Sequence, residues 1–490
     1  MNSHELIKNY IGGEWISPKS GTKTLKNINP ATLESIGEVV VSGREDAEAA
    51  VAAAKAAYPG WKRTTAPKRG AILAKAADEM LRRKDELARA LTLEEGKTLT
   101  EAGGEVQRAI NCIEFSAGEG RRLNGETIPS ELPANFCWTQ REPLGVVALV
   151  TPWNFPVAIP AWKLGPALVA GNTVVLKPAS ITPWCAKILA EIFETAGLPK
   201  GVFNVIFGPG SSVGDTLVNH PDVAAISFTG SNEIGTKLYS DAARHLKKVQ
   251  AEMGGKNPVI VLADADLDLA ATATVQGAFG STGQRCTATS RAIVVKEALA
   301  EFTRLVIEKT RALKVGDGIN PETHVGPCVD ESQFKTVLEY IDIGKKEATL
   351  ALGGERVGTT GFFVSPTVFT HVKRDARIAQ EEIFGPVLSI IEAADFEDAM
   401  TIANGVRFGL TSSIFTNDVG RVFQYLDQIE TGITHVNSPT VGGEAQMPFG
   451  GLKSTGVGGR DMGRTAIEFF SEWKSVYVDY TGTKRTSSVY

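Results

Sequence analysis

The feature that most constrains the fold is an alternation of short apolar runs with helical patterns. The apolar runs cover residues 145–151, 172–177, 202–207, 224–229 and 258–263, and helical patterns such as 182–196 separate them. Short apolar runs of this kind are typical of strands buried in a parallel sheet. Strand–helix–strand units that recur every ~25–30 residues predict an α/β protein with a doubly wound sheet.

A second α/β unit is predicted after Leu269, with strands near residues 291–296 and 387–392 and the join between the units near 252–266. Upstream of the first unit, helical spacing predicts helices over 45–57 and 67–97, the latter continuous. With 490 residues, the chain has room for about three folding units, two of them large.

Two segments fit neither unit. Residues 126–141, which include Pro129 and Pro133, predict a β-hairpin, and residues 473–480 alternate like a strand. Because an isolated hairpin is marginally stable in water, we expect these ribbons to pair with something larger. They therefore predict a sheet formed across subunits of an oligomer. The alternative is that both decorate the surface.

Charge and hydropathy exclude several classes of function. The 51 Lys and Arg against 56 Asp and Glu give a net charge of −5, so no basic excess is present to bind nucleic acid. The most apolar stretch, residues 164–176, is too short to span a membrane, and we expect it to be buried. The N-terminal residues lack the pattern of a signal peptide.

Cysteine and histidine usage argues against disulfides and metal sites. The five cysteines are an odd number without a CxxC spacing, which favours a reducing, cytoplasmic setting. The six histidines are scattered without the spacing of metal ligands, so no metal site is predicted.

Cys286 is the first candidate for chemistry. It lies in the segment STGQRCTATS, residues 281–290, a loop rich in glycine and hydroxyl residues between a helical pattern and a strand. Backbone N–H groups and a cation such as the adjacent Arg285 favour a thiolate, which is the nucleophilic form of cysteine. The alternative is a small buried side chain, as most free cysteines are.

Glu252 is the second candidate. It stands in the segment QAEMGGKNP, residues 250–258, between small or apolar neighbours and just ahead of a buried strand. Partial burial would raise its pKa toward neutrality and make it a usable general base. The alternative is an exposed carboxylate that caps a turn.

Further candidates lie at the carboxyl ends of predicted strands, where ligands bind in open α/β sheets. Asn154, in Thr151-Pro152-Trp153-Asn154, carries an amide that could donate to an oxyanion together with the N–H of Cys286. Other candidates are a cation in the Leu176-Lys177-Pro178 turn, two glycine turns at 208–214 and 228–235, and the segment EEIFGP at 381–386. Each of these is weak alone, and neither glycine turn matches a dinucleotide or P-loop fingerprint.

Taken together and in this order, the motifs resemble the aldehyde dehydrogenase family along nearly the whole chain, from Gly12-Gly13-Glu14-Trp15 to Pro448-Phe449-Gly450-Gly451. The resemblance implies an α/β fold with a Rossmann-like cofactor domain over 1–124 and 144–253 and an α/β catalytic domain over 254–450. It also implies a small β-ribbon for oligomerisation over 125–143 and 468–482.

The same resemblance implies the catalytic roles. Cys286 attacks the aldehyde and forms a thiohemiacetal, hydride passes to a nicotinamide, and water activated by Glu252 hydrolyses the resulting thioester. Asn154 and the Cys286 N–H form the oxyanion hole.

Positions that match the family's contacts to NAD or NADP are also implied. They are Thr151, Pro152, Trp153, Lys177, Ser180, Gly210, Gly214, Phe228, Gly230, Ser231, Gly235, Glu382 and Phe384. Relatives that strongly prefer NAD often have a glutamate at the position of Ser180. Because a serine leaves room for a 2′-phosphate beside Lys177, we predict that NADP is accepted and preferred to NAD.

The substrate is less constrained. The tracts 154–163 and 283–291 resemble those of bacterial 2-oxoglutarate-semialdehyde (2,5-dioxopentanoate) dehydrogenases. Two arginines that hold the carboxylate in succinate-semialdehyde enzymes are replaced here by Trp162 and Gly280. Arg285 resembles an arginine that holds an anionic tail, and its alternative role is structural or in support of a thiolate. Trp162 resembles a pocket residue for neutral aldehydes, which keeps a broad aldehyde dehydrogenase open.

Two other classes compete with this prediction. CoA-acylating relatives depart from the family at the position of Glu252, and a purely structural homologue would not need Cys286, Glu252 and Asn154 together. The expected partners are a small aldehyde and further copies of the chain, as a homodimer or homotetramer, without nucleic acid or membrane.

Overall fold

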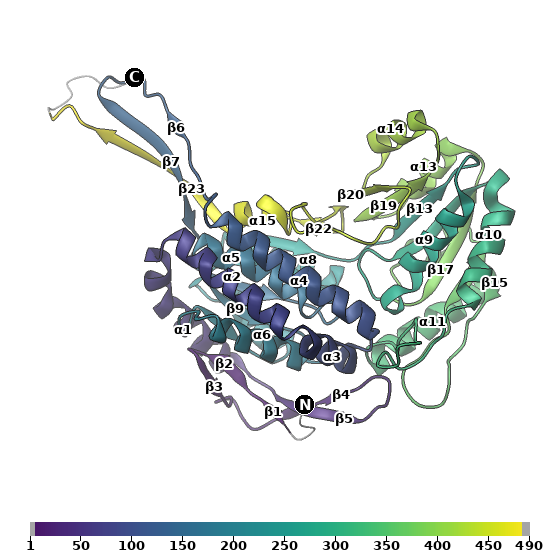
Figure 1. Ribbon diagram of the computed structural model, residues 1–490, viewed down its shortest axis with the longest axis horizontal. Coiled ribbons are helices and arrows are strands. Elements are labelled where there is room, and N and C mark those ends of the chain that lie inside the picture. Colours follow the sequence, from purple (N-terminus) through teal and green to yellow (C-terminus); the bar gives the residue numbers. More distant parts are fainter. Residues whose placement is uncertain (1–4, 483–490) are drawn as a thin grey trace.

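The computed structural model describes residues 5–482, and residues 1–4 and 483–490 lie outside this range. Two α/β lobes stand side by side, and a β-ribbon projects from the larger one (Figure 1). The larger lobe is built on an eight-stranded sheet in the order β22-β12-β11-β8-β9-β10-β2-β3. Its strands are β22 (Gly456–Val457), β12 (Lys248–Glu252), β11 (Val223–Thr229), β8 (Val146–Val150), β9 (Thr173–Lys177), β10 (Phe203–Val205), β2 (Asn9–Ile11) and β3 (Glu14–Ile16).

The five central strands, β12 to β10, are parallel, and four of them, β11, β8, β9 and β10, match predicted apolar runs. β12 was not predicted, and the run at 258–263 belongs to the smaller sheet. Helices cover both faces of this sheet: α1 (Arg44–Arg63), α2 (Ala66–Arg82), α3 (Lys84–Glu95), α4 (Leu99–Glu119), α5 (Ala158–Ala170), α6 (Pro183–Thr195), α7 (Asp215–Asn219), α8 (Asn232–Ala243) and α15 (Gly463–Phe469). Every residue of α5 is buried, so the prediction that the most apolar stretch is buried is confirmed.

The prediction of one continuous helix over 67–97 is wrong. The chain forms α2 and α3 with a break at Arg83, whose φ of −99° and ψ of 17° are not helical. The Arg83 guanidinium bonds to Glu86 and, on another helix, to Glu191. This tertiary contact falls at the break, where the local sequence has no glycine or proline to signal one.

The smaller lobe contains a seven-stranded sheet in the order β15-β16-β17-β14-β13-β19-β20, parallel except for β15. Its strands are β15 (Thr349–Leu352), β16 (Thr367–Thr370), β17 (Val387–Ala393), β14 (Thr289–Val295), β13 (Asn257–Val261), β19 (Thr411–Phe415) and β20 (Ile433–Val436). Its helices are α9 (Leu267–Phe279), α10 (Lys296–Arg311), α11 (Glu331–Glu347), α12 (Arg377–Gln380), α13 (Phe396–Asn404) and α14 (Val419–Gln428).

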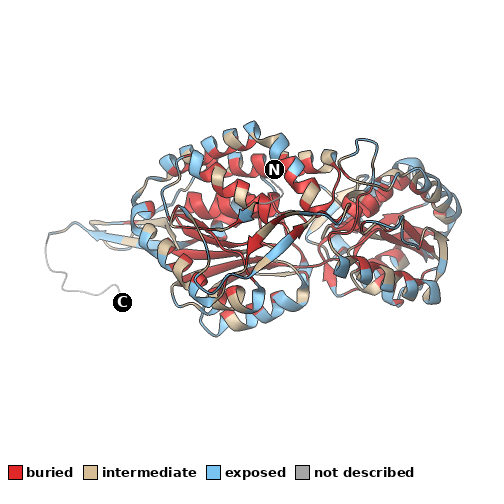
Figure 2. Cartoon of the chain, turned by 90° about the horizontal axis from the view of Figure 1, so that it is seen from below, coloured by how far each residue is buried: buried red, intermediate tan, exposed pale blue. Residues whose placement is uncertain are grey.

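The chain passes from the larger sheet to the smaller one over residues 253–256, between β12 and β13 and inside the region predicted for the join. Both sheets are buried between their helices, as Figure 2 shows by colour. The carboxyl end of β12 therefore lies where the two lobes meet.

The projecting ribbon consists of β6 (Thr127–Ile128), β7 (Asn135–Pro143) and β23 (Ser471–Asp479). β7 pairs antiparallel with both other strands, so the two predicted ribbons pair with each other (Figure 1). The ribbon exposes large apolar side chains, among them Phe136, Trp473 and Tyr477, which is 72% exposed. An apolar surface of this kind marks an interaction site.

Two small sheets complete the fold: β1 (Leu6–Ile7) with β5 (Ser35–Val40) and β4 (Thr24–Ile28), and β18 (Phe408–Gly409) with β21 (Leu452–Lys453). Within residues 5–482, no helix has the length and apolar character needed to cross a membrane. The same residues contain no cluster of three or more side chains suited to bind a metal ion.

Candidate active site

Cys286 lies in a loop at the amino end of β14, after a short 3-10 turn over Gly280–Gly283. Ser281, Thr282 and Gly283 have positive φ values of 50°, 59° and 68°. A Cβ at position 283 would overlap the carbonyl oxygen of Gly385, so only glycine fits there. The loop reverses direction within a few residues and presents a partly exposed Cys286 to the junction of the lobes.

Asn257 braces this loop from β13. Its amide Nδ2 donates to the carbonyl oxygens of Cys286, at 2.7 Å, and of Ala288, at 2.9 Å. Its Oδ1 accepts from the N–H of Thr411 on β19. A side chain of the smaller sheet thus fixes the backbone at and just after the nucleophile candidate.

Asn154 reaches the same loop from the larger lobe, because it follows β8 and its side chain is buried. Its Nδ2 donates to the carbonyl oxygen of Gln284 at 3.0 Å, two residues before Cys286. An amide nitrogen has two N–H groups, so one remains for another acceptor. Asn154 therefore lies close enough to the Cys286 loop for a shared oxyanion site.

A buried ion pair holds the Asn154 segment. Lys97 Nζ lies 2.6 Å from Glu105 Oε2 and donates to the carbonyl oxygen of Asn154 at 2.7 Å. Glu105 Oε1 accepts from the N–H groups of Val157 and Ala158 at the start of α5. The pair connects α4 to the loop that carries Asn154.

Glu252 ends β12 and is 3% exposed. Its Oε2 is buried and has no hydrogen-bond partner among the described residues, so it can accept a proton from water or substrate. Burial and the nearby Asp461 raise its pKa well above the usual value, whereas Arg460 and Lys163 lower it. The predicted direction of its pKa shift is confirmed, and the burial is more complete than the sequence predicts.

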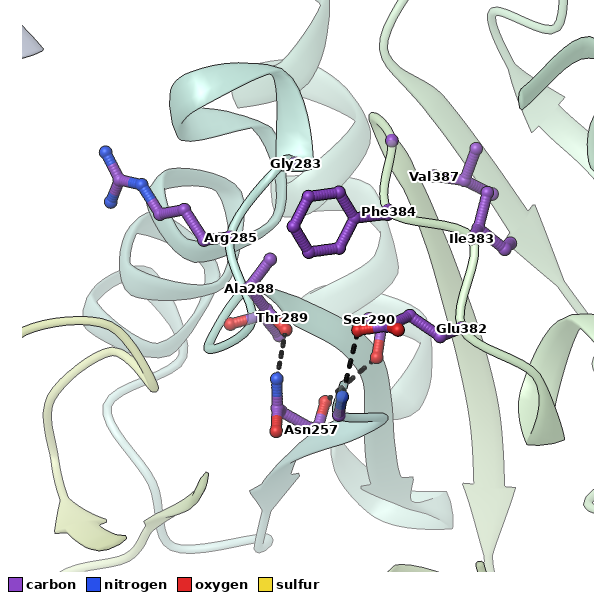
Figure 3. Close-up of a pocket in the computed structure, with 12 residues that line it drawn as sticks. Asn257, Gly283, Arg285, Ala288, Thr289, Ser290, Glu382, Ile383, Phe384 and Val387 are labelled. Carbon is purple, nitrogen blue, oxygen red and sulfur yellow. Dashed lines mark hydrogen bonds between the residues drawn. The ribbon is translucent and has the colours of Figure 1, made fainter. Parts of the chain in front are cut away.

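The expectation of a cation beside Cys286 that favours the thiolate does not hold for Arg285. Burial, Glu382 and Glu252 raise the pKa of the Cys286 thiol to about 12, and the cation that opposes this rise is Arg108. Arg285 instead donates from Nε to Ser281 Oγ at 3.0 Å, and its Nη2 lies 3.5 Å from Glu101 Oε1. Its guanidinium points away from Glu382 and Phe384 (Figure 3).

A cavity of about 300 Å³ lies between the lobes. Predicted site residues that line it are Pro152, Trp153, Asn154, Gly230, Ser231, Cys286, Glu382 and Phe384. Met253, Gly254, Gln333 and Thr336 also line it and were not predicted. The structure thus brings segments from both lobes, more than 200 residues apart in sequence, around one space.

Glu382 and Phe384 form the wall contributed by the smaller lobe. Glu382 Oε1 accepts from the N–H of Gly255 at 2.9 Å, and burial raises the pKa of this carboxyl to about 7. The Phe384 ring lies edge-on to the Trp153 ring, with centroids 5.5 Å apart. Figure 3 shows Phe384 and Glu382 on the side of the Cys286 loop opposite to Arg285.

The site continues from the cavity along the carboxyl ends of the strands of the larger sheet. A Cβ on Gly230 would lie 2.5 Å from the Phe228 ring, so a larger residue in the turn after β11 would require this ring to move. Gly235 lies in the first turn of α8, whose N-cap is Ser231, and helix N-termini favour anions such as phosphate. The N-terminus of α8 therefore presents backbone N–H groups of the kind that bind phosphate.

The remaining cofactor candidates lie farther along the same edge. Lys177 ends β9 next to β8, and the N–H of Thr151 donates to its carbonyl oxygen at 3.1 Å. Burial lowers the pKa of the Lys177 ammonium to about 8. Ser180 follows it, and Gly210 and Gly214 bound a single π-helical turn.

These residues fit a dinucleotide. Thr151 Oγ1 and Thr229 Oγ1 are buried and lack partners within the part of the chain that the structure describes. Lys177 Nζ donates to the Pro178 carbonyl and has no carboxylate within ion-pair distance among those residues. Free hydroxyls, an unpaired ammonium and a glycine turn are what the hydroxyl and phosphate groups of NAD(P) need.

Cys286 packs against an apolar cluster that includes Trp162 and Phe449. Trp162 on α5 is buried against the Phe449 ring, with centroids 5.4 Å apart. Arg108 on α4 lies over both rings. Sequence analysis missed Arg108, Asn257, Lys97 and Glu105; only Asn257, in the segment GGKNP next to Glu252, lay in a motif already singled out.

Comparisons with known proteins agree with this geometry. Residues 15–476 match the model of the aldehyde dehydrogenase family. The chain is 46% identical over 477 residues to the alpha-ketoglutaric semialdehyde dehydrogenase of Bacillus subtilis, covering 96% of this chain and 97% of that protein. It is 44% identical to the 2,5-dioxopentanoate dehydrogenase of Saccharolobus solfataricus, covering 96% and 99%. A crystal structure described as an E. coli NADP dependent enzyme superimposes with a TM-score of 0.94 at 38% identity, covering 96% and 98%.

Two α/β lobes around a cysteine and a dinucleotide-shaped cradle define an oxidoreductase that uses a nicotinamide cofactor. The chain belongs to the aldehyde dehydrogenase family. The predicted fold class, the family and the prediction of an NAD(P)-dependent aldehyde dehydrogenase are confirmed.

Proposed function

We propose that this enzyme oxidises 2-oxoglutarate semialdehyde to 2-oxoglutarate through a covalent intermediate on Cys286. The observation that carries the proposal is the convergence of Cys286, Asn154 and Glu382 on one cavity between the lobes. Glu252 directly precedes Met253 and Gly254, which line this cavity. The bound nicotinamide cofactor supplies the hydride acceptor. The residues that would hold it are Thr151, Pro152, Trp153, Lys177, Ser180, Gly210, Gly214, Phe228, Gly230, Ser231, Gly235, Glu382 and Phe384.

In the first half-reaction, the Cys286 sulfur attacks the aldehyde carbon, and negative charge develops on the carbonyl oxygen. The free N–H of the Asn154 amide and the backbone N–H of Cys286 would stabilise this oxyanion. Because burial favours the neutral thiol, its proton must pass to a base such as water as attack occurs. Loss of hydride from the thiohemiacetal leaves a thioester on Cys286.

In the second half-reaction, Glu252 would take a proton from the water that attacks the thioester. Its unpartnered Oε2 provides the acceptor. Because its pKa is raised, the Glu252 carboxylate is a stronger base than an ordinary carboxylate, which suits it to general-base catalysis near neutral pH. The presence of this base favours hydrolysis over acyl transfer to CoA.

The names of the two relatives above support 2-oxoglutarate semialdehyde as substrate. Succinate semialdehyde and a broad range of neutral aldehydes are the alternatives, the latter because of Trp162. Arg285 stays a candidate for binding the substrate, although Glu101 partly neutralises it.

A substrate series tests this proposal. With NADP in excess, we expect kcat/KM for 2-oxoglutarate semialdehyde to exceed that for succinate semialdehyde and for benzaldehyde by at least about tenfold, or about 1.4 kcal/mol of transition-state binding. Reduced cofactor, followed by absorbance, gives the rates. If benzaldehyde equals or exceeds the semialdehydes, the enzyme is a broad aldehyde dehydrogenase instead.

We also propose that NADP is preferred to NAD, because no acidic side chain stands at position 180 beside the unpaired Lys177 ammonium. Replacing Ser180 with glutamate would place a like charge against the 2′-phosphate. We expect the Ser180→Glu variant to lose about 100-fold in kcat/KM with NADP and less than about threefold with NAD. Parallel saturation kinetics with both cofactors check this, and an Ser180→Gln variant controls for side-chain size. Equal losses with both cofactors would contradict the assignment.

The proposed roles of the domains follow the two lobes and the ribbon. We propose that residues 1–124 and 144–253 bind the cofactor, that 254–450 carry the catalytic cysteine, and that 125–143 with 468–482 join subunits. The exposed apolar side chains of the ribbon support a homodimer or homotetramer. The five free thiols support a reducing, cytoplasmic location.

A further inference from the structure

Two buried hydrogen-bond donors behind Cys286 lack acceptors. Arg108 Nε and Trp162 Nε1 are both buried and have no hydrogen-bond partner among the described residues. The Arg108 guanidinium carbon lies 5.2 Å from the centroid of the Trp162 ring, so the two donors are neighbours. A buried donor without a partner costs about 1–3 kcal/mol, and a bound acceptor would offset this cost.

Arg108 also lacks a counter-ion. No carboxylate lies within ion-pair distance of it in residues 5–482, and its guanidinium donates to the sulfur of Met462, a weak acceptor, at 3.4 Å. Glu114 and Glu444 line a surface groove that also includes Arg108, but neither pairs with it. Glu105 acts on Arg108 only through longer-range electrostatics, so the guanidinium has no direct carboxylate partner among these residues.

Arg285 differs on each point. It is ion-paired with Glu101 and bonded to Ser281 Oγ, and none of its nitrogens is buried without a partner. An anion that approaches Arg285 must compete with the Glu101 carboxylate. Arg108 requires no such competition.

Arg108 is placed on the path of a substrate that reacts at Cys286. It is close enough to oppose the rise in the thiol pKa, and it reaches the surface through a groove whose lining includes Gly443 and Ala445. A Cβ at position 443 would lie 2.8 Å from Arg108 Nη2, so the guanidinium lies directly beneath this loop. The groove therefore connects solvent to Arg108, and Cys286 packs against the apolar cluster that contains Trp162 and Phe449.

We propose that Arg108, supported by the Trp162 indole N–H, binds the carboxylate and the adjacent 2-oxo oxygen of the substrate. The inference rests on the proposed function and names the residues that select its substrate. A guanidinium forms two parallel hydrogen bonds to a carboxylate, and this geometry sets the orientation of the bound molecule. In 2-oxoglutarate semialdehyde, four carbon–carbon bonds separate the carboxylate from the aldehyde, so one end binds Arg108 while the other meets Cys286.

Two donors of different kinds match two acceptors of different kinds. Arg108 supplies the charge that a carboxylate needs, and Trp162 supplies one neutral N–H that suits a ketone oxygen. Succinate semialdehyde lacks the ketone and would leave Trp162 Nε1 unpaired, which disfavours its binding. The aromatic faces of Trp162 and Phe449 would contact the methylene groups between the two ends.

Kinetics of single variants test this assignment. The enzymes are wild type, Arg108→Met, Arg108→Lys, Arg285→Met and Trp162→Phe, and the substrates are 2-oxoglutarate semialdehyde, succinate semialdehyde and pentanal, an uncharged five-carbon aldehyde. For Arg108→Met we expect kcat/KM with 2-oxoglutarate semialdehyde to fall about 50-fold, mainly through KM, and with pentanal to change by less than about threefold. Arg108→Lys should recover part of the loss, because it restores the charge without the paired donors.

Trp162→Phe keeps the ring and removes the N–H. We expect it to reduce the preference for 2-oxoglutarate semialdehyde over succinate semialdehyde about fivefold. Alkylation of Cys286 by iodoacetamide gives a second readout: 2-oxoglutarate, the product, should protect the wild type and fail to protect Arg108→Met.

The outcomes distinguish a wrong assignment of Arg108 from a wrong substrate. If Arg285→Met loses the preference and Arg108→Met retains it, the carboxylate binds Arg285 and this inference is wrong, although the proposed substrate stands. Equal losses of Arg108→Met on all three substrates would make Arg108 structural and would also overturn the inference. A wild-type enzyme that prefers pentanal would contradict the proposed substrate itself.

Discussion

Replacement of Cys286 by alanine is expected to lower kcat for aldehyde oxidation by at least about 10⁴-fold, because the covalent route then has no nucleophile. The loop that carries Cys286 is fixed from both lobes, by Asn257 on one side and by Asn154 on the other. Loss of one sulfur atom from a partly exposed position leaves these contacts intact. The change should therefore act on chemistry and leave folding and cofactor binding in place.

Steady-state rates and cofactor titration by fluorescence check this expectation. Cys137→Ala is a matched control, because Cys137 is a buried thiol in the ribbon, away from the cavity. The control should keep its activity within about twofold, as substitutions away from functional features usually do. A Cys286→Ala enzyme that retained a tenth of the wild-type rate would contradict a cysteine nucleophile at this position.

Replacement of Glu252 by glutamine is expected to slow turnover by about 10²–10⁴-fold, the usual contribution of a general base. The thioester should still form, because Glu252 is needed only for the attack of water. A burst of one reduced cofactor per active site should then precede a very slow steady state. Stopped-flow absorbance separates the two phases.

The pH dependence follows from the raised pKa of Glu252. Because its raised pKa keeps Glu252 protonated to a higher pH than an ordinary carboxyl, hydrolysis should speed up as pH rises through that pKa and level off above it. Glu252→Gln should lose this rise, whereas Glu392→Gln, at an exposed position of β17, should keep it. If Glu252→Gln showed neither a burst nor a change in the pH profile, Glu252 would not be the base for hydrolysis.

The sheets were predictable because their strands are buried on both faces. Runs such as residues 224–229 and 258–263 carry continuous apolar residues, and they became the central strands β11 and β13. The break at Arg83 was not predictable, because it carries no local breaker and coincides with a contact to Glu191. The pairing of β7 with β23 likewise depends on contacts over more than 300 residues.

The site was predictable where a motif follows a strand. Asn154 and Glu252 stand in such motifs, whereas Cys286 and Glu382 stand in motifs that precede a strand. The structure brings all four to the junction of the lobes. Arg108 was not predictable as a site residue, because it lies in the middle of the long helix α4, where an arginine is normally on a solvated face. Only the packing of α4 against α5 places its half-buried guanidinium beside Trp162. Arg285 is paired with Glu101 at the start of α4, a contact that its position next to Cys286 in the sequence did not indicate.

The central claim is an acyl-enzyme on Cys286 that Glu252 hydrolyses, and intact-mass spectrometry tests it most directly. Glu252→Gln is mixed with 2-oxoglutarate semialdehyde and NADP, quenched in acid after the burst, weighed and digested. We expect a mass increase equal to one 2-oxoglutaryl group, located on the peptide that contains Cys286 and absent from a Cys286→Ala, Glu252→Gln double variant. An unmodified protein after the burst, or an adduct on another residue, would contradict the account.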